Sequence, residues 1–498
     1  MWASSRRSLS SLEMAVVEQN AVALGTTIDA LMENAGRAVA EEATRHLPAP
    51  PARVAVVAST GNNGGDGTCA AFYLQQWGYS PEIWLVRPPV EIRSRAAQRC
   101  FDRVQHRVPV RVGVPRAEDL ATMPLVLDAL LGTGQSGTLR SPIREAVAAM
   151  SASGAPILAI DVPTGVNDPH GLRPNWTVTF TIPKDEMADR TVGELSVRDI
   201  GMPPNAWRRT GPGEFLFFPV PLEPRGRNGR VLVIGGGPYT GAPALAGLAA
   251  LRSGAERATV IAPEAAAEAI RSFSPNLIVT PIGSDRFRPT DVPAMLEEVR
   301  AAPPRAVVLG MGAGAAPDTT EALRTVISSL SPDVPLVVDA DGLAALPSTK
   351  EEAPRPSGGV LVATPNAGEF ERVFQGPASG SWEERSSRAE RIAQEGHFTL
   401  VVKGSPDILT DGESTVGNDH HHLAMTVGGV GDVLGGVLGS LLAQGVRPFH
   451  AARLATFWTG EAGFRAAARR GFGLVATDVI DELPAALVAG LQRVERSG

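Results

Sequence analysis

Short runs of β-branched and other apolar residues recur along the chain, separated by helix-like segments rich in alanine and leucine. Most of these runs are apolar throughout instead of alternating with polar residues, which is typical of strands buried on both faces. Buried strands that alternate with helices form parallel sheets covered by helices on each side. The sequence therefore predicts an α/β fold. The predicted strands are Arg53–Ala58, Pro81–Val86, Pro124–Leu130, Pro156–Asp161, Trp176–Phe180, Gly229–Gly235, Arg257–Ala262, Arg305–Gly310, Pro335–Asp341, Val360–Thr364 and Thr399–Gly404.

Two domains are expected, because 498 residues are too many for one ordinary hydrophobic core. The segment Phe217–Arg230 interrupts the apolar pattern with three prolines, two glycines and four charged residues, as a linker does. We therefore predict one domain over residues 1–218 and a second over residues 222–498. The motifs of the two halves differ, so the domains are not duplicates.

The charge balance and the cysteine content narrow the class of protein. A net charge of −7 and a pI of about 5.7 favour neither nucleic acid nor an anionic membrane surface as a partner. The two cysteines, Cys69 and Cys100, suggest neither a disulfide framework nor a metal cluster, and they fit a reducing cytosol. Neither a secretory signal nor a long apolar span is recognisable. We expect a cytoplasmic protein.

Three polar loops of the first half each follow a predicted strand: Ser59–Gly67, Leu127–Leu139 and Ile160–Asn167. Ligands of open parallel sheets bind at the carboxyl ends of the strands, so the three loops are expected to border one crevice. Any one of them could be a plain turn or a helix cap, but three at strand ends favour a binding site. Their glycines allow backbone amides to approach a phosphate. Their side chains also offer oxygen ligands suited to a hard cation: Asn63, Asp66, Asp128, Asp161 and Thr164.

Lysine is rare in this chain, which contains only Lys184, Lys350 and Lys403 among 46 basic residues. A lysine therefore marks a position that favours a compact ammonium group over a guanidinium. Lys184 follows the strand Trp176–Phe180, and Lys403 ends the strand Thr399–Gly404. Both are candidates for contact with a ligand, and a surface position for Lys184 is the alternative.

Together with Ala30–Gly36 and Lys184, the three loops resemble the YjeF N-terminal domain, the NAD(P)H-hydrate epimerase, over about Glu13 to Pro203. The resemblance implies a Rossmann-like fold with K⁺ beside the bound nucleotide. It also implies that Asp161 is the acid or base. Three departures from the family pattern are Glu18 for aspartate, Thr164 for serine and Asn175 for aspartate. Implied potassium ligands are Asn63, Asp128 and Thr164. Implied substrate contacts are Asn62, Asn63, Gly64, Gly65, Asp66, Gly132, Thr133, Gly134, Gln135, Ser136, Gly137, Thr138 and Asp161.

The strongest local signal of the second half is the sequence GGVGD, Gly428–Asp432, immediately before an apolar helix. Flexible amides at a helix N-terminus bind anions. Asp432 would be repelled by such an anion, so we interpret it as a base that activates a hydroxyl group for attack on phosphorus. A simple helix cap is the alternative. The tract His420–His422 lacks companion metal ligands and is expected to contact the nucleotide instead.

From about Gly229 to Ala485 the second half resembles the YjeF C-terminal domain, the NAD(P)H-hydrate dehydratase, which has a ribokinase-like fold. In this family pattern Asn366 replaces a histidine and Met311 replaces a proline. Asn366 can still form hydrogen bonds, but it cannot titrate near neutral pH. Implied substrate contacts are Ala242, Gly312, Asn366 and Asp432, with Asp432 as the base. Implied ADP contacts are Lys403, Gly404, Ser405, Pro406, Asp407 and Gly431.

The joint resemblance implies repair of damaged nicotinamide nucleotides. The first domain would interconvert the R and S forms of hydrated NADH and NADPH. The second would dehydrate the S form while ADP is converted to AMP and phosphate. K⁺ and ADP are the implied cofactor and co-substrate, Mg²⁺ is a candidate companion of ADP, and a homo-oligomer, a tetramer or larger, is implied. The alternatives are a hydroxymethylpyrimidine- or thiazole-type kinase in the second half and a non-catalytic binding module in the first.

Overall fold

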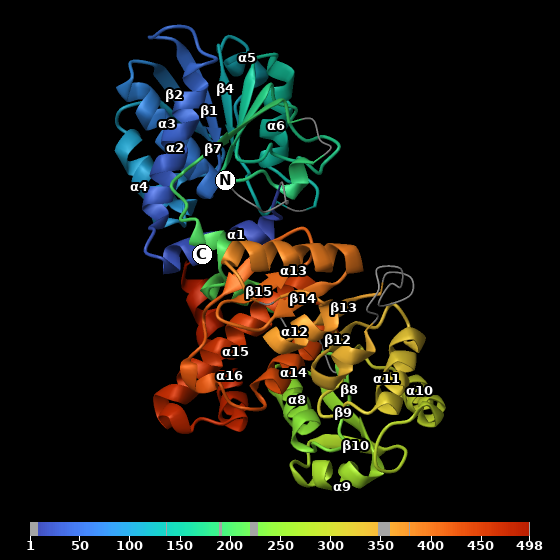
Figure 1. The fold of residues 1–498 in the computed structure, drawn as a ribbon. Helices are drawn as coiled ribbons and strands as arrows, with labels where there is room; N and C mark the ends of the chain where they lie inside the picture. Colours follow the sequence, from blue (N-terminus) through green and yellow to red (C-terminus); the bar gives the residue numbers. More distant parts are fainter. Residues whose placement is uncertain are drawn as a thin grey trace. The chain divides into compact units, whose positions relative to one another are not determined.

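The computed structural model describes residues 8–135, 137–188, 192–219, 228–346, 359–377 and 379–497. It divides into two compact units, Arg6–Ala206 and Trp207–Ser497, each built on its own sheet (Figure 1). Residues 207–218, which the sequence assigns to the first domain, lie in the second unit. There the Glu214 carboxylate accepts a hydrogen bond of 2.9 Å from Arg453, and both side chains are buried. Residues 220–227 of the predicted linker lie outside the described residues.

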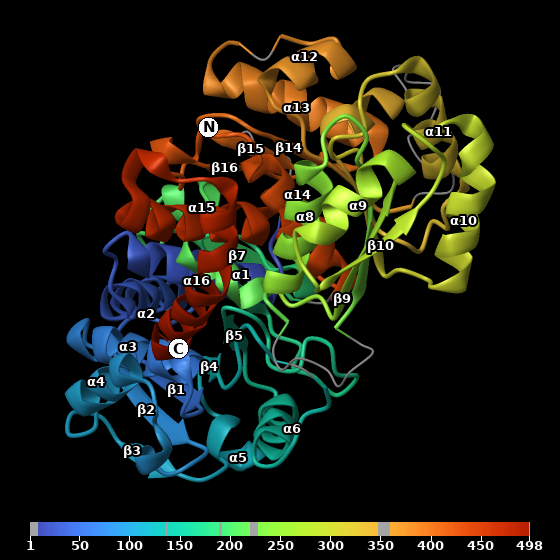
Figure 2. The same ribbon diagram turned by 90° about the horizontal axis from the view of Figure 1, so that it is seen from below.

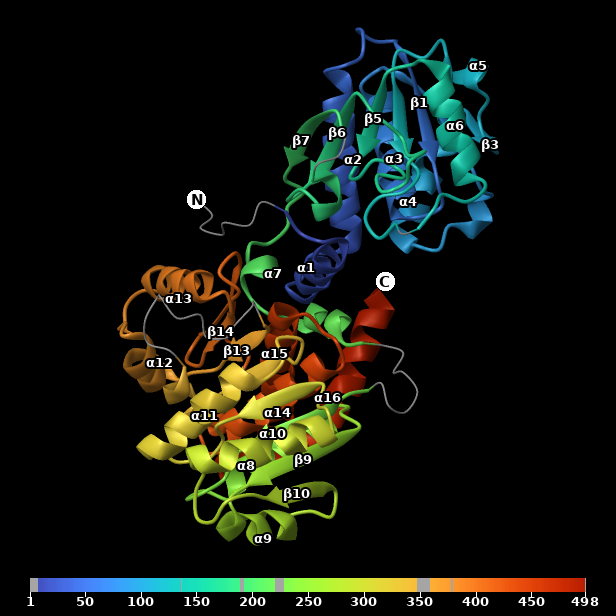
Figure 3. The same ribbon diagram turned by 90° about the vertical axis from the view of Figure 1, so that its right-hand side faces the viewer.

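The first unit contains a seven-stranded, all-parallel sheet in the order β3-β2-β1-β4-β5-β6-β7. Figure 3 shows β5, β6 and β7 toward one edge and β3 at the other. The chain reverses its direction of travel across the sheet between β1 and β4, which is where Rossmann-like sheets bind ligands. Its elements are α1 (Ser11–Ala23), α2 (Ile28–Thr44), β1 (Arg53–Ala58), α3 (Asn62–Gln76), β2 (Ser80–Leu85), α4 (Arg95–Val104), β3 (Val110–Val112), α5 (Ala117–Leu120), β4 (Val126–Ala129), α6 (Ile143–Ser153), β5 (Ile157–Ile160), β6 (Trp176–Phe180) and β7 (Glu194–Arg198).

Helices cover both faces of this sheet. Helices α2, α3 and α4 pack on one another along one face, whereas α5 and α6 pack on the other (Figure 1). The central strands are buried almost without exception, because both of their faces lie under helices. This arrangement brings the loops after β1, β4 and β5 to one edge of the sheet.

The second unit contains a nine-stranded sheet in the order β10-β9-β8-β11-β12-β13-β14-β15-β16. The strands from β10 to β14 pair in parallel, and β15 and β16 extend the sheet as an antiparallel hairpin. Its elements are β8 (Arg230–Ile234), α8 (Gly241–Arg252), β9 (Arg257–Ala262), α9 (Glu264–Ser272), β10 (Leu277–Pro281), α10 (Val292–Ala301), β11 (Ala306–Leu309), α11 (Pro317–Ser329), β12 (Leu336–Val338), β13 (Leu361–Ala363), α12 (Ala367–Phe374), α13 (Trp382–Gly396), β14 (Thr399–Val402), β15 (Asp407–Thr410), β16 (Thr415–Asn418), α14 (Val430–Ala443), α15 (Pro448–Arg470) and α16 (Ala476–Ser497). The short α7 (Asn205–Arg208) spans the junction between the units.

In this unit α8, α14, α15 and α16 pack together, and Figure 2 shows α15 and α16 on the opposite side from α10 and α11. Helices α10 to α13 share a second apolar core with the strands. Helix α14 lies against β8, β11 and β12, so its N-terminus is held near the ends of the central strands. Among the described helices, none has both the length and the apolar character needed to cross a membrane.

The predicted α/β class is confirmed, with one mostly parallel sheet in each of the two units. All predicted strands form, and their bounds agree with the structure within a few residues. The sequence missed β3, β7, β10, β15 and β16, which lie at or near sheet edges, where short or exposed strands carry a weaker apolar signal. The predicted strands pair in parallel, whereas the additional strands β15 and β16 form an antiparallel hairpin at the edge of the second sheet.

The first glycine-rich loop is largely helical, because α3 begins at Asn62. Its glycines serve close packing. A Cβ atom on Gly64 would lie 1.9 Å from the backbone oxygen of Ser59, and one on Gly67 would lie 2.4 Å from the Cβ of Ala129. Glycine therefore lets the first turns of α3 approach the ends of β1 and β4.

We predict that Gly64→Ala destabilises the first unit by about 1–3 kcal/mol, because the clash is with backbone that cannot rotate away. Chemical denaturation followed by circular dichroism measures the loss. Gly61→Ala is the matched control, since its new methyl group would lie 3.7 Å from the nearest neighbour. Equal stability of the two variants would contradict this explanation.

Candidate active sites

A buried ion pair organises the first site. Asp161 follows β5, and its Oδ1 atom lies 2.6 Å from the Nζ atom of Lys184. The same ammonium group donates to Thr179 Oγ1 at 2.9 Å and to the Phe180 carbonyl at 3.0 Å, and Lys184 is only 2% exposed. The alternative of a surface Lys184 is therefore wrong. Asp161 has a φ of 64°, a left-handed conformation that costs a non-glycine residue about 1 kcal/mol or more.

The charge of Asp161 raises the pKa of two further carboxyl groups, Glu18 of α1 and Asp66 of α3. Burial and this charge raise the pKa of Asp66 well above its usual range. The Glu18 side chain is exposed to solvent, and partial desolvation of its carboxyl group together with the charge of Asp161 raises its pKa. Lys184 opposes both shifts. This site therefore holds groups that can carry a proton near neutral pH.

The three predicted potassium ligands come from three different loops. Asp128, at the end of β4, is fully buried and accepts hydrogen bonds from the Thr164 hydroxyl at 2.7 Å and the Thr164 amide at 2.9 Å. Burial raises the pKa of Asp128 to about 6 despite these bonds. Asn63 is 8% exposed, and neither atom of its side-chain amide has a hydrogen-bond partner in the part of the chain that the structure describes. An orphaned buried amide and a buried carboxyl group are the kinds of donor that an oxygen-ligated cation requires.

The loop after β4 is tied to the loop after β5. The Gln135 side chain donates to the carbonyls of Gly132 and Pro163 and accepts from the Gly165 amide. The Thr133 amide donates to Asp161 Oδ2 at 3.2 Å. Gly134, Gly137 and Thr138 are exposed, as is Asn62, whereas Gly64 and Gly65 are buried. Ser136, a predicted substrate contact, lies outside the described residues.

The second site is built on the N-terminus of α14. Gly429 precedes the helix with a φ of 96°, and Gly431 and Asp432 lie in its first turn, as the sequence predicts. Burial and the charge of Asp339 raise the pKa of Asp432 to about 7. Lys403 opposes this shift, whereas Asp341 and Glu369 add to it.

The Lys403 ammonium group lies beside this helix end and pairs with Asp339, which follows β12. The Nζ–Oδ1 distance is 2.7 Å, and Glu369 Oε2 lies 4.0 Å from the same nitrogen. A Cβ atom on Gly431 would lie 3.2 Å from Lys403 Nζ and 3.6 Å from Asp339 Oδ2, so the helix end approaches this ion pair closely. Although burial lowers the pKa of Lys403, the charges of Asp339, Glu369 and Asp432 raise it overall. The lysine therefore stays cationic.

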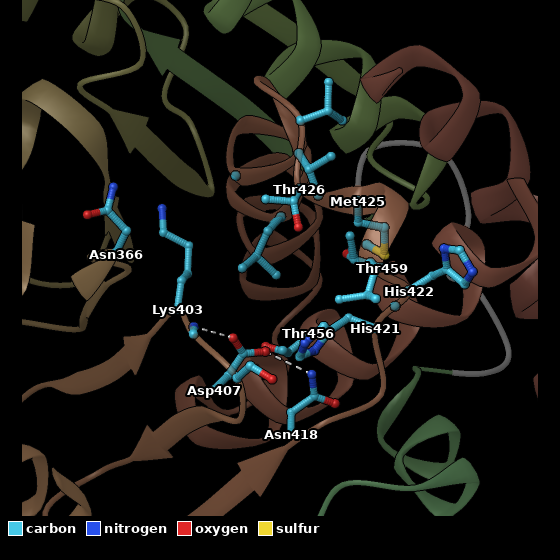
Figure 4. A pocket seen from close by; sticks show the side chains of 18 of the residues that line it. Asn366, Lys403, Asp407, Asn418, His421, His422, Met425, Thr426, Thr456 and Thr459 are labelled. Carbon is cyan, nitrogen blue, oxygen red and sulfur yellow. Dashed lines mark hydrogen bonds between the residues drawn. The ribbon is translucent and has the colours of Figure 1, made fainter. Parts of the chain in front are cut away.

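A cavity of about 680 Å³ opens beside Lys403 and Gly431. In Figure 4, Asn366 and Lys403 lie on one side, and His422, Met425 and Thr459 lie across from them. Asp407 also lines the cavity. Its carboxylate accepts hydrogen bonds from the Gly404 amide at 2.7 Å and from Asn418 Nδ2 at 2.8 Å. The predicted ADP contacts Lys403, Gly404, Ser405, Asp407 and Gly431 all line this cavity, whereas Pro406 is not among its lining residues.

The predicted substrate contacts of the second half form two groups. Asn366 lines the cavity and caps α12, accepting from the Glu369 amide at 2.9 Å. Gly312 adjoins Ala242, because a Cβ atom on Gly312 would lie 3.2 Å from the Ala242 Cβ. Gly312 also has a φ of 66°, which favours glycine.

The histidine tract divides its side chains between two roles. His421 and His422 line the cavity, as expected of residues that contact a nucleotide. His420 Nε2 lies 2.9 Å from Glu461 Oε2, and its ring stacks on Phe457. Among the described residues, these histidines form no group with the spacing of metal ligands.

Sequence reasoning did not identify Asp339 or Glu369 as site residues, and it treated Glu18 only as a departure from a family pattern. The strand-end position of Asp339 was visible, but its pairing with Lys403 depends on the adjacency of β12, β13 and β14. Lys350, the third lysine, lies outside the described residues.

Comparison with known proteins gives consistent matches for both units. Residues 231–485 match the family described as NAD(P)H-hydrate dehydratase, and residues 28–186 match the family described as YjeF-related protein N-terminus. The chain is 38% identical to the bifunctional NAD(P)H-hydrate repair enzyme Nnr of Hyperthermus butylicus, over 98% of this chain and 94% of that protein. It is 37% identical to the protein of the same name from Pyrobaculum aerophilum, over 96% and 97%. A solved ADP/ATP-dependent NAD(P)H-hydrate dehydratase from Bacillus subtilis is 23% identical, over 54% of this chain and 93% of that one, with a TM-score of 0.45.

We predict that Lys184→Met destabilises the first unit by about 3–5 kcal/mol, because it leaves the Asp161 carboxylate buried without its partner. Thermal and chemical unfolding measure the effect. The double variant Lys184→Met/Asp161→Asn removes the buried charge and should recover part of the lost stability. A single variant as stable as the unmodified protein would contradict the structural role of the pair.

Proposed function

This chain belongs to the family of bifunctional NAD(P)H-hydrate repair enzymes, and we propose that it restores hydrated NADH and NADPH through two activities. The first unit interconverts the R and S hydrates. The second dehydrates the S form to NAD(P)H while ADP becomes AMP and phosphate. The observation that carries the proposal is the position of Asp432, a carboxyl group of raised pKa at a glycine-rich helix N-terminus beside Lys403.

In the second unit we assign Asp432 as the base. It takes the proton of the hydrate hydroxyl group, whose oxygen attacks the terminal phosphorus of ADP, and the P–O bond to AMP breaks. The phosphate then leaves with the C–O bonding electrons while a neighbouring ring carbon loses a proton, which forms the C=C bond of NAD(P)H. Lys403 and the amides of Gly428–Gly431 stabilise charge on the transferring phosphoryl group. A base with a pKa near the working pH is suited to this task.

In the first unit we assign the acid/base role to Asp161, held by Lys184 and Thr133. Asn63, Asp128 and Thr164 are proposed to hold K⁺, which would supply fixed positive charge beside the bound nucleotide. The orphaned amide of Asn63 and the buried carboxyl group of Asp128 support this assignment. The proposal also includes Mg²⁺ bound with the ADP phosphates, a cytoplasmic location and a homo-oligomer that is a tetramer or larger. These three parts rest on the sequence resemblance.

Asp432→Asn is expected to abolish dehydration and leave epimerisation intact, because only the second unit loses its base. Asp161→Ala should do the reverse, and loss of epimerisation would also exclude a non-catalytic binding role for the first unit. Recovery of reduced nicotinamide absorbance measures dehydration, and chromatography of the two hydrates measures epimerisation. Dehydration at a near-normal rate in Asp432→Asn would overturn the assignment.

The pH dependence tests the role of Asp339, which we propose as a positioning residue for Lys403. Because Asp432 must be ionised, kcat/KM for dehydration should fall as pH drops below about 7. In Asp339→Asn, loss of the neighbouring negative charge lowers the pKa of Asp432, so the midpoint should move to lower pH. The ADP phosphates titrate equally in assays of both proteins, so they do not contribute to the difference between the two midpoints. A purely structural role would lower the rate without moving the midpoint. Asp341→Asn should give a smaller shift.

Potassium binding can be tested without measuring activity. The pKa of Asp128 in the fold is about 6, above its ordinary 3.8, so without a cation the ionised carboxylate weakens the fold as pH rises through this range. K⁺ favours the ionised form. It should therefore raise the melting temperature more at pH 8 than at pH 5, relative to choline chloride of equal ionic strength. Asp128→Asn should remove this difference. An equal effect of K⁺ in both proteins would contradict the site.

A further inference from the structure

Three neighbouring helices of the first unit bring two thiols and a carboxylate together. The sulfur atoms of Cys69 and Cys100 and a carboxylate oxygen of Glu33 all lie within 4.8 Å of one another. Cys69 belongs to α3, Cys100 to α4 and Glu33 to α2. Both cysteines are reduced. The sequence suggests neither a disulfide framework nor a metal cluster for these cysteines, and it does not predict that helix packing places them side by side.

The cluster lies just beneath the surface and beside a cation. Arg103, also on α4, donates a hydrogen bond to the Glu33 carboxylate, and so does the Tyr73 hydroxyl group. The Cys69 sulfur lies 3.4 Å from the same carboxylate. The cysteines are 0% and 5% exposed, but the Glu33 and Arg103 side chains above them are 32% and 38% exposed. A small reagent can reach the sulfurs when these two side chains move.

The two thiols are not equivalent. A hydrogen bond with Cys69 lowers the pKa of Cys100. Burial and the charge of Glu33 oppose this effect and the charge of Arg103 supports it, so that the pKa is lowered overall. The same hydrogen bond and burial raise the pKa of Cys69. Because the thiolate is the nucleophile and Cys100 is also the more exposed of the two thiols, Cys100 is the expected first site of attack. This is the arrangement of a reactive cysteine beside a resolving cysteine.

We infer that Cys69 and Cys100 form an oxidation site for small hydroperoxides, which close a disulfide between α3 and α4. The Cys100 thiolate attacks one peroxide oxygen, the O–O bond breaks, and Cys100 becomes a sulfenic acid as hydrogen peroxide releases its first water. The Cys69 sulfur then attacks the Cys100 sulfur and expels the hydroxyl group as the second water. In total, two thiols and one hydrogen peroxide give one disulfide and two waters.

The disulfide would change the geometry of the candidate epimerase site. This consequence rests on the proposed function, whereas the oxidation itself does not. Cys69 follows Asp66 by one helical turn on α3, and Asn63 belongs to the turn before. The helices already touch closely there, since a Cβ atom on Gly65 would lie 2.8 Å from the Ala97 Cβ of α4. A disulfide that draws α3 and α4 closer together would therefore put pressure on the first turns of α3. It also removes the Cys100 charge, which helps to raise the pKa of Asp66.

The test treats the full-length protein with graded hydrogen peroxide, blocks the remaining thiols with N-ethylmaleimide and measures the intact mass. The expected product has lost two hydrogen atoms, carries no maleimide and returns to the starting mass with dithiothreitol. In Cys69→Ser, Cys100 should accumulate as a sulfenic acid that dimedone traps. In Cys100→Ser, Cys69 should resist oxidation. If either cysteine variant fails to fold, Arg103→Gln provides the test instead, because it changes an exposed position. This variant should slow the oxidation several-fold.

Three outcomes would overturn the inference. The first is that the thiols of the folded protein stay reduced until it unfolds. The second is that both single variants oxidise at the same rate, which would remove the assigned order of reaction. The third is a divalent metal: if Zn²⁺ binds with a stoichiometry of one per chain and requires both cysteines and Glu33, the cluster is a metal site. Epimerisation that is unchanged by a fully formed disulfide would overturn only the coupling to α3.

Discussion

A lysine paired with a strand-end aspartate is the interaction on which both candidate sites depend. In the first unit Lys184 holds Asp161 at 2.6 Å, and in the second Lys403 holds Asp339 at 2.7 Å. A carboxylate taken out of water is costly unless a cation and hydrogen bonds compensate it. Each lysine supplies that compensation at the carboxyl edge of a parallel sheet, where the loops of each candidate site converge. Replacing either lysine would leave a buried negative charge at the centre of a site.

Burial in these sites raises the proton affinity of neighbouring carboxyl groups that lack such a direct partner. Asp432 reaches a pKa of about 7, and Asp128 reaches about 6. The same physical effect serves different ends. A raised pKa lets Asp432 accept a proton at neutral pH, whereas at Asp128 it marks a carboxyl group whose ionised form a bound cation would stabilise. The surroundings of a carboxyl group, more than its residue type, thus decide whether it is suited to carry a proton or to bind a cation.

Much of this organisation is readable in the sequence. Apolar runs between helical segments identify the central strands, and GGVGD places Asp432 in the first turn of α14. Edge strands such as β3 are hard to see because exposure weakens their apolar pattern. The partners of the lysines, the orphaned amide of Asn63 and the meeting of Cys69 with Cys100 could not be predicted. They depend on which strands and helices become neighbours, and local pattern does not encode that adjacency.

The central claim is that one chain repairs both hydrates by combining epimerisation with ADP-dependent dehydration. It is tested most directly by incubating the purified protein with a mixture of R and S hydrates, with and without ADP or ATP, and following the absorbance of reduced nicotinamide. We expect full conversion that requires the nucleotide and produces AMP and phosphate when the nucleotide is ADP. Conversion that stops after one epimer would contradict the role of the first unit. Accumulation of a phosphorylated product would contradict the role of the second and indicate a small-molecule kinase.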